Sequence, residues 1–173
     1  RDFAIRWADV LAAKFPEATY CEDALLFVAR IHDRAGDVKD VTAVVERILR
    51  EFPAGDMVPD AAWLLVWSFY KDGRYDEALA AIESLAPKMP AQADYRSDGR
   101  LDYWAGRILL KQKKPKEARA SFEEVLRRYP MSWYGLLSYL RLEQQKKGRG
   151  GKALAAVRKE SAATLPDLPE VLA

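Results

Sequence analysis

The sequence predicts an all-α protein built from repeated helix-turn-helix pairs. Apolar residues followed by proline recur at intervals of 37, 37 and 40 residues. Glycines recur in phase with these prolines, and apolar residues between the markers follow the spacing of amphipathic helices. Because proline and a left-handed glycine both end helices, each interval predicts two helices and a turn. The pairs are Phe15-Pro16, Phe52-Pro53, Met89-Pro90 and Tyr129-Pro130, and the glycines are Gly36, Gly73 and Gly148.

The chain is predicted to open with residues 3–15 as the second helix of a truncated repeat. Apolar stripes on either side of Gly36 then predict the first complete pair, because their members are three or four residues apart. The stripes are Leu25, Val28, Ala29 and His32, and then Val41, Val44, Val45, Ile48 and Leu49.

The second pair is predicted over residues 61–70 and 75–85, with Gly73 in the turn between them. The third is predicted over 101–112 and 115–129, and here Lys113 takes the place of the glycine. Pro115 suits a first helical turn, where its missing N–H costs nothing.

The fourth pair is predicted over residues 132–145 and 152–160. Small residues stand where paired helices must approach closely, at Ala78, Gly106 and Ala118. We also expect the large rings of Trp104 and Phe122 to lie in the core.

The segment 61–90 resembles the tetratricopeptide repeat, with Tyr75 after the turn, the small Ala78 and the terminal Pro90. Each such unit buries its apolar face only against its neighbours, so the resemblance implies a right-handed superhelix of tetratricopeptide-like repeats.

The domain organisation follows from this count of repeats. Residues 1–165 are expected to form one repeat domain of about four helix pairs plus the leading half repeat. Residues 166–173 contain Pro166 and Pro169 and are expected to be a tail or linker.

A finer resemblance lies between Asp102 and Leu142, about a quarter of the chain. It consists of an aromatic pair with a small residue and an arginine, then Glu-Ala, then Ser-aromatic-Tyr-Gly-Leu-Leu, with Ser138 where alanine is commoner. The stretch resembles the helical superhelix of soluble lytic murein transglycosylases. The residues are Tyr103, Trp104, Gly106, Arg107, Glu117, Ala118, Ser132, Trp133, Tyr134, Gly135, Leu136 and Leu137.

This resemblance implies a periplasmic, peptidoglycan-cleaving parent enzyme whose superhelix precedes a lysozyme-like catalytic domain. The chain opens on Arg1, as expected of a fragment, and the resemblance implies a covalently linked catalytic domain in the parent, absent from this chain. Whether that domain follows Ala173 is left open by the sequence. The family's catalytic Glu-Ser is followed by a Gly-Leu-Met-Gln segment, which does not follow Glu160-Ser161 here. We therefore interpret that pair as the end of a helix and expect no enzyme activity in this chain.

Other classes of function find little support in the composition. Residues 1–90 carry 11 Lys/Arg against 16 Asp/Glu and residues 91–173 carry 17 against 10, but no groove-reading motif accompanies the basic half, so nucleic acid is not an expected partner. No apolar run is long enough to span a membrane. One histidine, His32, and one cysteine, Cys21, favour packing roles, and we expect no metal and no cofactor.

The candidate ligand groove consists of aromatic residues and one arginine on predicted first helices. The first three are spaced i, i+4 and i+7, and the other two stand at corresponding places one repeat later. Such a surface could hold a glycan strand or an extended peptide on the concave side, or the stripe could be core. The residues are Trp63, Trp67, Tyr70, Tyr103 and Arg107.

The leading hypothesis is a non-catalytic scaffold from a lytic transglycosylase that positions peptidoglycan or partners for a catalytic domain. The alternative is a free-standing tetratricopeptide adaptor of the cell envelope that binds protein peptides. The fold does not choose between them, because many functions share it.

Overall fold

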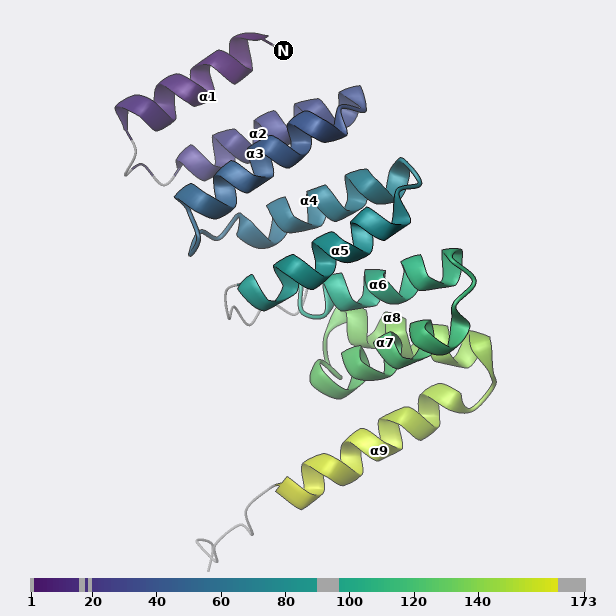
Figure 1. Cartoon of the computed structure of the whole chain (residues 1–173). Helices are drawn as coiled ribbons and strands as arrows, with labels where there is room; N and C mark the ends of the chain where they lie inside the picture. Colours follow the sequence, from purple (N-terminus) through teal and green to yellow (C-terminus); the bar gives the residue numbers. More distant parts are fainter. Residues whose placement is uncertain (1, 16–17, 19, 90–96, 165–173) are drawn as a thin grey trace, which may run out of the picture. The chain divides into compact units, whose positions relative to one another are not determined.

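The computed structural model describes residues 2–15, 18, 20–89 and 97–164, with side chains to residue 161. These residues form nine α-helices and one short 3-10 helix and contain no strand (Figure 1). The chain divides into two compact units, residues 1–92 and 93–173.

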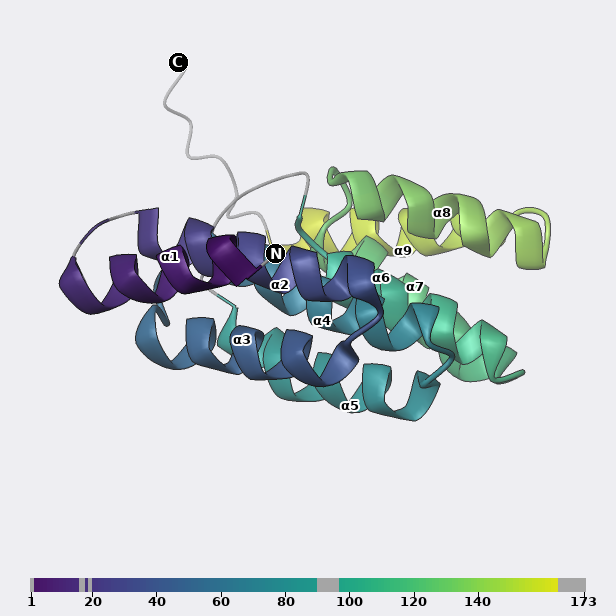
Figure 2. The ribbon, with the colours of Figure 1, turned by 90° about the horizontal axis from the view of Figure 1, so that it is seen from above.

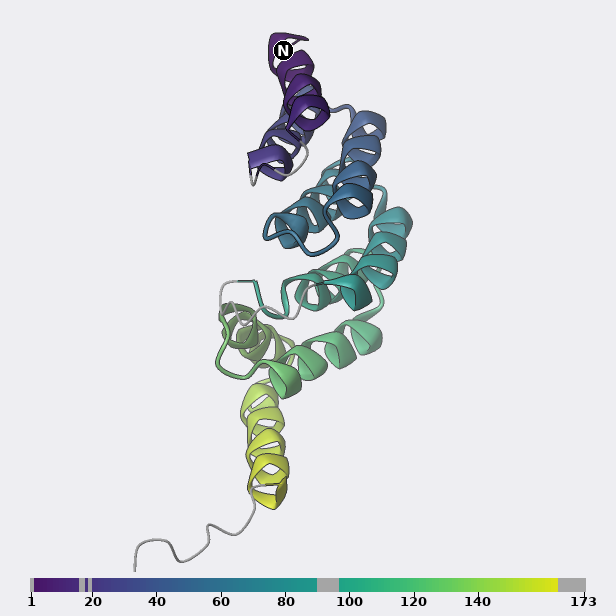
Figure 3. The ribbon, with the colours of Figure 1, turned by 90° about the vertical axis from the view of Figure 1, so that its left-hand side faces the viewer.

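The first unit contains five α-helices whose packing follows a repeat. The helix α2 packs against α3 and α4, α3 packs against α4, and α4 packs against α5, while α1 packs against α2. Figures 2 and 3 show α2 and α4 in one layer and α3 and α5 in another. The helices are α1 (Asp2–Lys14), α2 (Tyr20–Ala35), α3 (Val38–Glu51), α4 (Val58–Lys71), α5 (Tyr75–Leu85) and the 3-10 helix η1 (Ala86–Lys88).

The second unit repeats this pattern with two further pairs. The helix α6 packs against α7 and α8, α7 packs against α8 and α9, and α8 packs against α9. The four helices are α6 (Arg100–Lys111), α7 (Pro115–Arg128), α8 (Trp133–Gln145) and α9 (Arg149–Thr164). In the described part of the chain, α1 and four successive helix pairs therefore lie where the sequence predicts a leading half repeat and four pairs.

The turn inside each pair has the left-handed backbone that the glycine pattern predicts. The φ angles of Gly36 and Gly73 are both 75°, and that of Gly148 is 80°. Lys113 adopts a φ of 60°, although it has a Cβ. The repeat therefore imposes the turn conformation even where the sequence does not supply glycine.

The core of the second unit forms around Phe122, which is fully buried, and Tyr103, which is 2% exposed. Gly106 lets α6 approach α7 closely, because a Cβ there would lie 2.6 Å from the Phe122 ring. Ala118 is also fully buried, as predicted. Trp104 is only partly buried and packs against the edge of this cluster, so its prediction as a core residue holds only in part.

Two residues of the finer motif, Ser132 and Gly135, have structural roles at the start of α8. The Ser132 hydroxyl accepts a hydrogen bond from the Gly135 N–H at 3.0 Å and so caps the helix. A Cβ at Gly135 would lie 2.1 Å from the carbonyl oxygen of Tyr129. The serine and the glycine therefore have structural reasons of their own.

The helix α9 is longer than the predicted 152–160. Gly150 lies inside the helix, where it permits close approach to Tyr139: an added Cβ would be 2.8 Å from the Tyr139 carbonyl oxygen. The N–H groups of Gly148 and Gly151 donate to the Glu143 carboxylate at 2.7 and 3.0 Å. Glu143 thus caps α9, and these hydrogen bonds lower the pKa of its carboxyl group.

The other predicted helix bounds lie within three residues of the observed ones, and residues 75–85 match α5. Pro16, Pro90 and the predicted tail 166–173 lie outside the described residues. Glu160-Ser161 lies near the C-terminal end of α9, in agreement with the interpretation from sequence, and both residues are exposed. The division into a repeat domain and a tail, and the right-handed winding across both units, stay predictions.

Candidate functional site

The predicted aromatic stripe on α4 exists as a ladder of rings. Trp63 and Trp67 have ring centroids 5.6 Å apart, and Trp67 and Tyr70 stack at 5.5 Å with an interplanar angle of 17°. Tyr75, at the start of α5, extends the ladder at 5.7 Å from Tyr70. All four side chains are half-buried. They are therefore less exposed than the wall of an open groove and more exposed than core residues.

The repeat register identifies the side of α4 that carries this ladder. One repeat earlier, at a distance of 37 residues, the positions equivalent to Trp63 and Tyr70 are Leu26 and Asp33 of α2. Leu26 is 2% exposed, and the Asp33 carboxylate lies 2.7 Å from the Lys71 ammonium of α4. This side of α2 therefore faces α4, the next first helix within the first unit. Whether the ladder on α4 packs or lines a groove stays a prediction.

The other two groove candidates, Tyr103 and Arg107, lie together in the second unit. The Arg107 guanidinium donates to the Tyr103 hydroxyl at 3.2 Å and lies over the Trp104 ring, 5.1 Å from its centroid. Because Tyr103 is 2% exposed, its ring is a core side chain rather than a groove wall. Whether this group aligns with the α4 ladder stays a prediction.

A third residue, which the sequence did not single out, completes this group. The Arg141 Nε of α8 donates to the same Tyr103 hydroxyl at 3.2 Å, and its Nη1 donates to Gln144 Oε1 at 2.8 Å. Two guanidinium groups from neighbouring first helices thus converge on one phenol oxygen. Tyr134 packs beside them, its ring centroid 5.4 Å from that of Tyr103.

The outer face of α8 is apolar and exposed. Trp133, Leu136 and Leu140 are spaced i, i+3 and i+7 and are 54%, 51% and 44% exposed. Met131, just before the helix, is 91% exposed. We call these four residues the α8 apolar face. Their helical spacing was visible in the sequence, but a stripe of this kind ordinarily indicates core, so the surface was not predicted.

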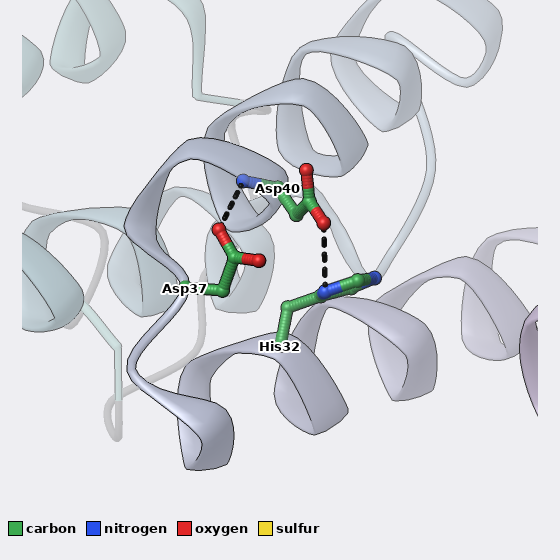
Figure 4. A group of neighbouring side chains, drawn as sticks. All are labelled: His32, Asp37 and Asp40. Atoms are coloured by element: carbon green, nitrogen blue, oxygen red, sulfur yellow. Dashed lines mark hydrogen bonds and ion pairs between the residues drawn. The ribbon is translucent and has the colours of Figure 1, made fainter. Parts of the chain in front are cut away.

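His32, Asp37 and Asp40 are the described side chains that come closest to a set of metal ligands (Figure 4). His32 Nδ1 lies 3.3 Å from Asp40 Oδ2, and Asp37 caps α3 by accepting the Asp40 N–H at 3.2 Å. The caps and the His-Asp contact already account for these atoms. We assign them a structural role that ties α2 to α3, in agreement with the predicted packing role of His32.

Glu22 is a buried acid with a similar anchoring role. It is 8% exposed, and its carboxylate accepts the Met57 N–H at 3.3 Å. Gly55 leaves room for it, because a Cβ there would collide with the carboxylate. Loss of hydration on burial raises the pKa of Glu22, and Asp56 adds to this shift. The group fastens the loop before α4.

None of the helices in the described part of the chain has the length and apolar character needed to cross a membrane.

Comparison with known families agrees with the packing pattern. A family model described as Tetratricopeptide repeat matches residues 29–95, 64–132 and 103–166. The three overlapping matches together span residues 29 to 166, which is well over half of the chain, and their staggered starts follow the repeat period. Neither the search of curated proteins nor the search of solved structures found a match.

Proposed function

Because the chain belongs to the tetratricopeptide repeat family, we propose that it is a non-catalytic scaffold that binds a segment of another protein on its first helices. Repeats of this kind present extended surfaces made from successive equivalent helices.

The observation that carries this proposal is the α8 apolar face. An isolated exposed leucine needs no explanation, but a contiguous set of large apolar side chains on one helix is typical of an interaction site. Trp133 adds a large ring of the kind that dominates binding energy at protein interfaces. The face lies on a first helix, which is the helix class that lines the binding side of such repeats.

Selection from a random dodecapeptide library displayed on phage, with the purified chain immobilised, tests the proposal. We expect peptides to be enriched, and we expect Trp133→Ser and Leu140→Ser to weaken their binding by about tenfold or more. Phe3→Ser is the control, because Phe3 is 75% exposed but lies on α1. Failure to enrich any peptide would contradict the proposal.

A second candidate function is that of the leading hypothesis from sequence: the scaffold region of a periplasmic lytic transglycosylase, positioning peptidoglycan for a covalently linked catalytic domain. The resemblance between Asp102 and Leu142 supports it. The structural reasons for Gly106, Ser132 and Gly135 reduce the weight of that resemblance, because helix packing and capping alone require these residues. The free-standing envelope adaptor needs neither peptidoglycan nor a catalytic domain.

Sedimentation with insoluble peptidoglycan separates these candidates. The transglycosylase candidate predicts that the chain sediments with the sacculi and that Arg107→Ala releases it. It also predicts no soluble anhydro-muropeptides from this chain. Release of such products, abolished by Glu160→Gln, would show that Glu160 is catalytic after all. The open reading frame that encodes the chain, read beyond Ala173, shows whether a catalytic domain follows.

A further inference from the structure

The group formed by Tyr103, Arg107 and Arg141 has unused hydrogen-bonding capacity. The Tyr103 hydroxyl accepts two N–H groups, which leaves its own hydrogen to donate, and the structure gives that hydrogen no acceptor among the described residues. Each guanidinium has five N–H donors. Towards the described residues, Arg107 uses one of them in a hydrogen bond, on Nη1, and Arg141 uses two, on Nε and Nη1.

The partners of these two arginines are neutral, unlike those of the arginines on α7. Arg107 and Arg141 bond to a phenol and an amide, and no carboxylate in the described part of the chain forms an ion pair with either. Elsewhere in the second unit, Arg119, Arg127 and Arg128 are paired with Glu123, Glu124 and Asp102. Two like charges that share one neutral acceptor repel each other, and a bound anion would relieve this repulsion.

Arg141 lies on α8 beside the α8 apolar face. At 100° per residue, Gln144 and Leu137 stand between Arg141 and Leu140 around the helix. The hydrogen bond from Arg141 to Gln144 shows that the arginine side chain reaches in this direction. The surface therefore runs from a pair of cations to exposed Leu and Trp side chains within a few helical turns.

From these contacts we propose that Arg107 and Arg141, which the buried Tyr103 hydroxyl holds together, form a binding site for a side-chain carboxylate, and that the α8 apolar face beside it binds the neighbouring apolar residues. The ligand is an extended protein segment in which an Asp or Glu lies close to large apolar side chains. This inference rests on the proposed scaffold function and specifies its partner. Guanidinium groups suit the task because two parallel N–H groups match the two oxygens of a carboxylate.

The charge distribution agrees with this choice of partner. Residues 91–173 carry 17 Lys/Arg against 10 Asp/Glu, so an acidic segment is attracted to this half of the chain and a basic one is repelled.

The dodecapeptide selection supplies the test. Peptides displayed through their C-terminal ends have no free terminal carboxylate, so any required acid is a side chain. We expect the enriched peptides to contain Asp or Glu near Leu, Ile, Phe or Trp. Synthetic amidated copies should bind the Arg107→Gln/Arg141→Gln variant at least about tenfold more weakly than the unmodified chain, since each charge-assisted hydrogen bond contributes about that factor.

The matched control is Arg119→Gln/Arg127→Gln, which removes the same charge from α7, where both arginines are paired with glutamates. It should change affinity by less than about twofold at about 0.15 M salt. Replacing Asp and Glu of the peptide with Asn and Gln should weaken its binding to the unmodified chain by the same factor. This second measurement tests the proposal even if the arginine variant folds poorly.

Each other outcome overturns the inference in a recognisable way. If the enriched peptides lack acids, the carboxylate site is wrong. It is also wrong if the peptides bind the two double-arginine variants equally well. In both cases the scaffold proposal remains valid. No enrichment at all removes the scaffold proposal as well.

Discussion

Lys113 holds a backbone conformation that costs a residue with a Cβ about 1 kcal/mol relative to glycine. Its φ is 60°, and the equivalent turns in the other repeats have glycine. We expect Lys113→Gly to raise the free energy of unfolding by about 0.5–1 kcal/mol, measured by urea denaturation. The reciprocal change, Gly73→Ala, should lower it by about 1 kcal/mol. A stabilising Gly73→Ala would contradict the argument, because nothing within 4 Å of the added Cβ could account for it.

Glu143 gives the stability a defined dependence on pH. The Gly148 and Gly151 N–H groups lower its pKa in the folded chain. Its contribution is therefore fully present above the ordinary glutamate pKa, about 4.3, and is lost as pH falls through the lowered folded value. Glu143→Gln should melt at a lower temperature than the unmodified chain at pH 7, with the difference shrinking towards pH 3. A difference that is the same at both pH values would show that the carboxylate charge does not stabilise α9.

At the scale of single elements, the aromatic ladder on α4 makes a quantitative prediction. Trp67 is half-buried between Trp63 and Tyr70, and each aromatic pair contributes about 0.5–1.5 kcal/mol beyond burial. We expect Trp67→Ala to lower the free energy of unfolding by about 2 kcal/mol, measured by chemical denaturation.

The control for the ladder is Trp133→Ala, which removes the same side chain from the α8 apolar face. Trp133 is 54% exposed, so its loss should stay within about 0.5 kcal/mol. If Trp67→Ala costs no more than this control, the ladder is a surface and the groove interpretation gains support.

The elements themselves could be predicted well because their signals are local. A proline or glycine acts within a few residues of itself, and apolar spacing defines each helix without knowledge of its partners. The prediction was wrong at the start of α9, which was expected at residue 152 but lies at Arg149, so that the helix includes Gly150 and Gly151. The helix includes them because Tyr139 and Glu143, on the preceding helix, supply close contact and a cap.

The candidate site was predicted only in part, because some of its contacts join residues that are far apart in the sequence. Arg107 and Tyr103 are four residues apart on one helix, so their contact follows from helical geometry. Arg141 meets them from 38 residues away, and the spacing of the repeats varies between 37 and 40, too much to place a side chain. Burial of the Tyr103 ring likewise depends on Phe122 of the next helix.

Across the whole molecule, stability is expected to be uneven. The helix α1 packs against α2 and buries only Ala8, whereas α2 packs against α1, α3 and α4. Local opening costs least where few apolar contacts are lost. Hydrogen exchange on the full chain should show amides of α1 exchanging at least about tenfold faster than those of α2. Equal protection of the two helices would mean that they open as a single unit.

The burial of Cys21 gives this opening a chemical signature. Its sulfur is inaccessible and donates to the Phe15 carbonyl oxygen at 3.1 Å, at the junction of α1 and α2. Since the chain has one cysteine, a thiol reagent added to the native protein can react only in molecules whose junction has come apart. At high reagent concentration the rate of labelling becomes independent of the reagent and equals the rate of opening. The rate of Cys21 labelling in the unmodified chain therefore measures how often α1 separates from α2.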